Sequence, residues 1–115
     1  NELVNMYIQP LKKSFTRLQS ATLVIAQRGI VNPDEAGAAA SEYLKLFGLV
    51  AIAYMWAQTA VQIKRRRGNM SQEFYDAKLK TGLFYMQRIL PQTGALLSSI
   101  MSGCDNTMSL DESQF

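Results

Sequence analysis

Residues 35–63 constrain the fold most, because their apolar side chains recur at alternating steps of four and three residues. On a helix this spacing forms one continuous stripe, made up of Ala36, Ala40, Tyr43, Phe47, Val50, Tyr54, Ala57 and Val61. A stripe this long has to be covered by several other helices, so the sequence predicts a helical bundle with this segment at its centre. We expect Phe47 in the core, where Phe47→Ala would cost roughly 3 to 5 kcal/mol.

The central helix has recognisable signals at both ends. Asn32 can cap its first amides, with Glu35 at the spacing of a capping box, and Pro33 suits the first turn. The basic run from Lys64 to Arg67 meets the negative end of the helix dipole, and a glycine follows as a stop. These signals predict a helix over 33–67, and they account for most of the basic run without a ligand.

Three further helices complete the expected bundle. The first ends near residue 29 and carries a stripe of Leu11, Phe15, Leu18, Thr22 and Ile25. The third starts at Asn69 or Ser71, is ended or kinked by Pro91, and carries Tyr75, Leu79, Gly82, Met86 and Ile89. The fourth runs from Gln92 to Gly103, and a frayed tail follows. Gly48 and Gly82 are expected at close helix contacts.

The turn signals leave no room for strands, and no linker divides the chain. The sequence therefore predicts an all-α protein: an up-and-down bundle of about four helices with a long central helix, forming one domain over residues 1–115. Such a bundle, cut from a larger body, should either self-associate or expose an apolar patch of more than about 400 Å². We expect that patch to include some of Leu49, Ile52, Ala53 and Trp56.

Candidates for chemistry are few. The chain has no histidine and one cysteine, Cys104, so triads that need histidine and zinc sites built on histidine or several cysteines are excluded. Helix capping and solvation account for the carboxylates, which include Glu35, Glu42, Glu73 and Asp76. No basic neighbour lowers the pKa of Cys104, and no glycine-rich phosphate loop is present. We therefore expect no catalytic, cofactor-binding or metal-binding residue in this chain.

Charge, cysteine content and hydropathy limit the partners and the cellular compartment that the sequence suggests. A net charge of +3 is too small to indicate a nucleic-acid binder, and a single cysteine fits a reducing, cytoplasmic compartment. Residues 46–63 lack charge and precede the basic run, as in a membrane span. Gln58, Thr59 and Gln62 dilute that segment, so we favour a buried core helix and expect no span.

Several segments together resemble a known family. The run SEYLKLFGLVA at 41–51, followed by YMWA at 54–57, is similar to the helical extension at the carboxyl end of certain acyl-CoA dehydrogenases. FY at 74–75, AKL at 77–79, FY at 84–85 and LP at 90–91 continue the similarity into a leucine-rich helix closed by Gly103. The resemblance covers roughly 38–108 closely and the first helix only in pattern.

The resemblance implies an accessory structural and assembly domain. Complete enzymes of that family use FAD and a glutamate base to oxidise acyl-CoA thioesters to 2-enoyl-CoA, with these sites in the preceding body of the protein. No position here matches those motifs, so the resemblance carries no catalytic or cofactor residue over, and FAD is expected only in the parent enzyme. The implied partners are the remainder of the parent dehydrogenase and a second subunit, with acyl-CoA as the parent's substrate.

A second function class stays open at this point. The bundle could be an independent interaction module that docks an acidic partner through Lys64 to Arg67. The chain opens on Asn1-Glu2-Leu3, without a methionine or the pattern of a signal peptide, and we expect it to be a piece of a longer protein.

Overall fold

The computed structural model describes residues 2–65 and 71–102, which are almost entirely helical. The elements in chain order are η1 (Val4–Ile8), α1 (Gln9–Val31), α2 (Pro33–Arg65), α3 (Gln72–Phe84), η2 (Tyr85–Ile89) and α4 (Gln92–Ser102). No strand occurs among these residues, and the predicted all-α bundle with a long central helix is confirmed. The expected features at Arg66 to Asn69, Gly103 and the tail beyond it lie outside the described residues.

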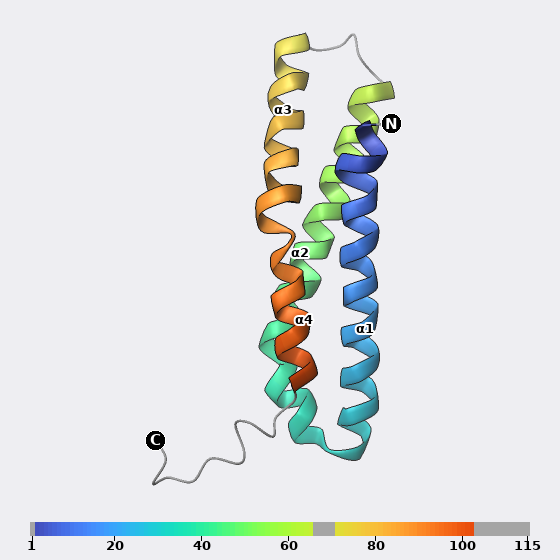
Figure 1. Ribbon diagram of the computed structural model, residues 1–115, viewed down its shortest axis with the longest axis vertical. Coiled ribbons are helices and arrows are strands. Elements are labelled where there is room, and N and C mark those ends of the chain that lie inside the picture. The colour runs from blue at the N-terminus through green and yellow to red at the C-terminus, as the bar shows by residue number, and fades with distance from the viewer. Residues whose placement is uncertain (1, 66–70, 103–115) are drawn as a thin grey trace, which may run out of the picture.

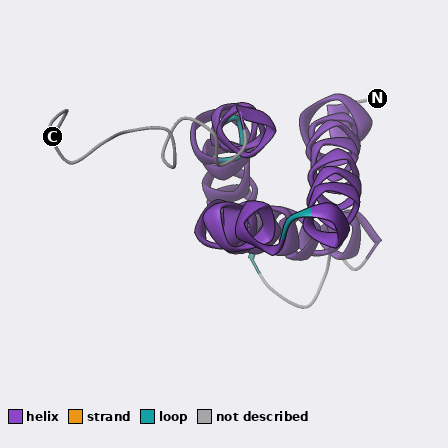
Figure 2. Ribbon diagram, turned by 90° about the horizontal axis from the view of Figure 1, so that it is seen from below, coloured by secondary structure: helices purple, strands orange, loops and turns teal. Residues whose placement is uncertain are grey.

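The helices form three columns. In Figure 1, α1 and α2 run antiparallel, while α3 and α4 follow one another along a third column. Figure 2 shows the ribbons in cross-section as a U, in which α2 joins the other two columns. The third and fourth helices share a column because the break between them, at Leu90 and Pro91, is too short to reverse the chain.

A widened π-helical turn stands shortly before Pro10 and another before Pro91. The first, Val4–Ile8, leads directly into α1, which has Pro10 in its first turn, and the second is η2. A proline inside a helix lacks an amide hydrogen, and its ring clashes with the carbonyl four residues earlier. A π-helical turn relieves that crowding, so η1 and α1 continue as one column through Pro10.

The helix starts follow the predicted caps. The Asp34 amide donates to Asn32 Oδ1 at 3.1 Å where α1 turns into α2. The turn is tight, because a Cβ added at Gly29 would lie 3.1 Å from the Ala36 Cβ. Ser71, one of the two predicted caps of the third helix, accepts a hydrogen bond from the Phe74 amide at 3.1 Å.

The buried face of α2 is not the predicted stripe: at every second position of the stripe, the buried residue is the one that precedes the predicted residue. The structure buries Ala39, Leu46, Ala53 and Ala60, where the prediction placed Ala40, Phe47, Tyr54 and Val61. Both stripes share Tyr43, Val50 and Ala57 and have the same four-three spacing. The expected core position of Phe47 is therefore wrong: its side chain is 52% exposed, whereas Leu46 is 0% exposed.

The same shift occurs on α1. Ser14 and Ala21 are buried in place of the predicted Phe15 and Thr22, and Phe15 is 50% exposed. The Ser14 hydroxyl is satisfied within its own helix, donating to the Leu11 carbonyl at 2.9 Å. Ala21 packs in one buried cluster with Ala39 and Leu46 of α2, while the larger Phe15 remains at the flank of the helix pair.

The third column follows the predicted stripe. Tyr75, Gly82 and Met86 are buried, with Leu79 and Ile89 half-buried beside them. The close contact expected at Gly82 is confirmed, because an added Cβ would lie 2.7 Å from Tyr7 Oη and 2.8 Å from Trp56 Cε3. The close contact expected at Gly48 is wrong, because nothing lies within 4 Å of a Cβ there.

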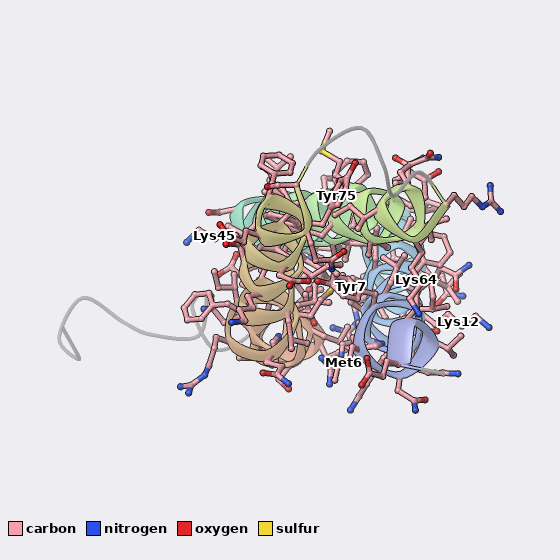
Figure 3. All side chains as sticks on the ribbon, turned by 90° about the horizontal axis from the view of Figure 1, so that it is seen from above. Met6, Tyr7, Lys12, Lys45, Lys64 and Tyr75 are labelled. Atoms are coloured by element: carbon pink, nitrogen blue, oxygen red, sulfur yellow. The ribbon has the colours of Figure 1, made fainter. Side chains whose placement is uncertain are left out.

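Two buried tyrosines join the columns through backbone carbonyls. Tyr7 Oη donates to the Leu79 carbonyl at 2.5 Å, and Tyr85 Oη donates to the Leu49 carbonyl at 2.6 Å. Viewed from above, Tyr7 lies between the columns near the middle of the bundle (Figure 3). Burial raises the pKa of both hydroxyls, and at Tyr7 the Leu83 backbone lowers the pKa by a smaller amount.

Candidate docking surfaces

Helix α2 carries a second complete apolar stripe on the face that no other described helix covers. We call it the outer seam; its residues follow the four-three spacing and are Ala40, Leu44, Phe47, Ala51, Tyr54, Gln58 and Val61. All of them except half-buried Val61 are exposed. The outer seam contains no charge, and its one amide, Gln58 Nε2, donates to the neighbouring Tyr54 hydroxyl at 3.1 Å.

The exposed area of the outer seam is large for so small a protein. Leu44 is 71% exposed, Phe47 52% and Tyr54 54%, and Met55 beside them is 64% exposed. At the ~150–250 Å² that a large aromatic side chain can bury, these four residues alone leave about 450 Å² uncovered. The largest apolar patch of a typical monomer measures about 300–600 Å² and is often functional.

The border of the outer seam toward α1 is ordered by contacts. Tyr43 shares a hydrogen bond of 2.8 Å with the Thr22 hydroxyl of α1, and its ring centroid lies 6.5 Å from that of Phe47. Phe15 precedes Thr22 by two helical turns and so lies on the same side of α1. The aromatic surface therefore extends from α2 onto the neighbouring helix.

An apolar patch is present, but it is centred differently from the prediction. Ala53 is 0% exposed, and Leu49 and Trp56 are half-buried, because α3 and η2 cover that side of α2. Trp56 lies against Gly82, and Lys78 Nζ lies 6.0 Å from its ring centroid. Of the four expected residues only Ile52 is exposed, at 45%.

A basic groove lies between α1 and the break at Pro91. Its volume is about 450 Å³, and one wall is a ridge of polar side chains at every fourth residue, namely Asn5, Gln9, Lys13 and Arg17. Arg17 is held in place, because its Nη1 donates to the buried Thr93 Oγ1 at 2.9 Å and its guanidinium lies over Gly94. Among the described residues no carboxylate pairs with Lys13 or Arg17, so the groove can accept an anionic group.

The carboxylates considered for chemistry do not come together. Glu73 and Asp76 are exposed on α3, whereas Glu35 and Glu42 are half-buried on α2. In residues 2–65 and 71–102, no group of three or more His, Cys, Asp or Glu could hold a metal ion. The expectation for Cys104 lies outside the described residues.

Lys64 and Arg65, the described part of the basic run, are exposed at the end of α2.

Helix α2 is long and apolar enough to cross a membrane, with mean hydropathy 1.5 over 18 residues. Buried core helices pass the same test. Helix α1 packs alongside α2 and carries Lys12, Lys13 and Arg17, which a bilayer would admit only at high cost. The packing fits the predicted bundle helix, and the absence of a membrane span stays a prediction.

The amino-acid sequence matches a known domain family. The family model described as acetyl-CoA dehydrogenase C-terminal like matches residues 2–111. The chain belongs to this family. The acetyl-CoA dehydrogenase C-terminal-like assignment confirms the resemblance and extends it over the first helix, which the residues alone matched only in pattern. No curated protein matches the chain.

The sequence pattern identifies four of the seven residues of the outer seam but assigns them the wrong role. Ala40, Phe47, Tyr54 and Val61 were recognised as an apolar stripe and were assigned to the core. It missed the basic groove, because Arg17 and Thr93 are far apart in sequence and only the fold brings them together. The spacing of four from Asn5 to Arg17 was the one available signal for that ridge.

Proposed function

We propose that this chain is an accessory structural and assembly domain of an FAD-dependent acyl-CoA dehydrogenase, which oxidises acyl-CoA thioesters to 2-enoyl-CoA. The chain itself supplies no catalytic, cofactor-binding or metal-binding residue. Its partners are the remainder of the parent dehydrogenase and a second subunit, in the cytoplasm. Family membership over residues 2–111 supports the link to the dehydrogenase.

The observation that carries the assembly role is the uneven cover of α2. This helix is apolar on nearly all sides, a pattern typical of a helix that is surrounded by protein. Yet α1, α3 and α4 cover only one side of it, and leave Leu44, Phe47 and Met55 more than half exposed. A domain that functions while docked on another protein surface would keep such a face apolar.

The described residues do not fit a flavin. The basic groove is open, and its polar wall consists of separate side chains on one helix. A flavin pyrophosphate is usually held by a glycine-rich turn at a helix start, and Gly94 stands alone beneath the Arg17 guanidinium. We therefore place FAD, the acyl thioester and the catalytic base in the body of the parent enzyme and derive no chemical step from this domain.

The independent interaction module has less support. Lys64 and Arg65 are exposed, but they stand in the last turn of α2, where basic side chains are favoured by the helix dipole alone. They also do not explain the outer seam, which is uncharged. The assembly role accounts for both the family and the exposed face.

The proposal is tested on the full parent protein. Extending the reading frame upstream of Asn1 should reveal a dehydrogenase body, and removing residues 1–115 from that protein should leave its flavin absorbance intact while its assembly state or solubility declines. The chain expressed alone should be colourless and should reduce no artificial acceptor with acyl-CoA. Flavin purifying with the 115-residue chain, or an upstream frame without a dehydrogenase, would contradict the proposal.

A further inference from the structure

The outer seam is built like a packing seam between helices. Its four-three spacing continues without interruption from Ala40 to Val61, a length of about 30 Å at 1.5 Å per residue. Seams of this kind are covered by another helix lying nearly parallel or antiparallel to them. Among the described residues, α1, α3 and α4 are all engaged on the other faces of α2, so the covering helix comes from elsewhere.

We infer that the outer seam of α2 pairs with the same seam of a second copy of this chain, the two helices running antiparallel about a two-fold axis near Ala51. This inference names a partner for the assembly role and rests on the proposed function. A two-fold interface requires one surface that is complementary to itself, and both shape and charge meet that requirement here.

Shape is the first argument. Ala51, at the middle of the outer seam, is small, and Phe47 and Tyr54 flank it one turn to either side. Two antiparallel alignments of the two helices keep the four-three spacing and lie close to the centre of the seam. In one of them Ala51 faces Phe47 of the second chain, and in the other it faces Tyr54, so large side chains pack over small ones. Gly48 beside the seam leaves further room, since nothing lies within 4 Å of its missing Cβ.

Charge is the second argument, and it selects the direction. The first turn of α2 carries Asp34 and Glu35, and the last turn carries Lys64 and Arg65. An antiparallel pair centred near Ala51 brings the acidic end of each helix beside the basic end of the other. A parallel pair would place like charges together at both ends, which is unfavourable.

Area is the third argument. The four large side chains of this face already expose about 450 Å², and Ala40, Ala51 and Val61 extend it. Standard protein interfaces bury about 800 Å² on each partner. The face is thus of the right order for a stable two-fold pair, and its lack of charge matches the core of such interfaces.

The first test is the association state of the full chain, measured by sedimentation equilibrium over a range of concentrations. We expect a dimer that Leu44→Lys converts to a monomer. The matched control is Leu23→Lys, since Leu23 is a similarly exposed leucine, at 58%, that belongs to α1 and not to the outer seam. Circular dichroism of both variants should be unchanged because both positions are exposed. A wild-type monomer at all concentrations, or a dimer that survives Leu44→Lys, would overturn the inference.

The second test determines the direction, using a short bifunctional thiol reagent in a Cys104→Ser background. Ala40→Cys alone should give no crosslinked dimer, because antiparallel pairing holds the two positions about 30 Å apart. The same holds for Val61→Cys alone, whereas the chain carrying both substitutions should crosslink efficiently between copies. Crosslinking by either single variant would indicate a parallel pair and refute the two-fold arrangement.

Repeating the crosslinking in the full parent protein separates this inference from the proposed function. If the parent body covers the seam, the double-cysteine variant will not crosslink between subunits there, and Leu44→Lys will instead loosen the contact between domain and body. That result refutes pairing with a second copy and leaves the assembly role intact. The assembly role itself would be refuted if removing residues 1–115 changed neither the assembly state nor the solubility of the parent protein.

Discussion

Replacing Gly82 by alanine tests the closest contact in the fold. The new Cβ would lie 2.7 Å from Tyr7 Oη and 2.8 Å from Trp56 Cε3, distances that real Cβ atoms do not tolerate. Neither neighbour can simply swing aside: the Tyr7 hydroxyl is bonded to the Leu79 carbonyl, and Trp56 is half-buried between the columns. The substitution must therefore push α3 away from η1 and α2 or break the tyrosine hydrogen bond.

Two opposing effects set the magnitude. Alanine in place of glycine within a helix gains about 1 kcal/mol from propensity. Overpacking a tight site costs about 1 to 3 kcal/mol, and weakening the Tyr7 hydrogen bond adds about 1 kcal/mol. We expect Gly82→Ala to destabilise the fold by about 1 to 3 kcal/mol, which corresponds to a fall in Tm of roughly 5 to 15 °C.

The chain contains its own controls. Gly37 and Gly48 stand in α2 with nothing within 4 Å of an added Cβ, so alanine there should gain about 0.5 to 1 kcal/mol. Chemical denaturation of the three variants at one protein concentration gives the comparison. If Gly82→Ala raised stability as the controls do, α3 would not approach η1 and α2 as closely as described.

Three further outcomes are expected. Leu46→Ala should cost about 2 to 5 kcal/mol because Leu46 is 0% exposed, whereas Leu23→Ala should cost less than about 1 kcal/mol; equal costs in denaturation would refute the buried face of α2. Tyr7 has a raised pKa when folded, so above about pH 10 the unfolded state loses its proton first and stability should fall with rising pH; a pH series should show a smaller loss in Tyr7→Phe, and an identical loss would exclude this tyrosine as a cause. Arg17→Met should cost about 1 kcal/mol or more, because it removes the partner of the buried Thr93 hydroxyl, and a neutral result in thermal denaturation would show that the bond contributes nothing.

Local signals in the sequence were sufficient for the elements. Asn32 and Ser71 accept the capping hydrogen bonds expected of them, and Pro91 breaks the third column where predicted. These features depend on a few neighbouring residues, which the sequence displays directly. The two π-helical turns before the prolines were not predicted, since the sequence shows only that a proline disturbs the helix and not how the backbone relieves it.

The sequence alone determined that α2 is a long helix with apolar faces, and it could not determine which face is the core. Two stripes with the same spacing share Tyr43, Val50 and Ala57, and periodicity cannot choose between them. Tertiary packing decided for the stripe of Ala39, Leu46, Ala53 and Ala60, because its mostly small side chains leave room for residues of η1, α1, η2 and α4 to pack against α2. Phe47 and Tyr54, the bulky residues of the other stripe, were left exposed, and they became part of the outer seam.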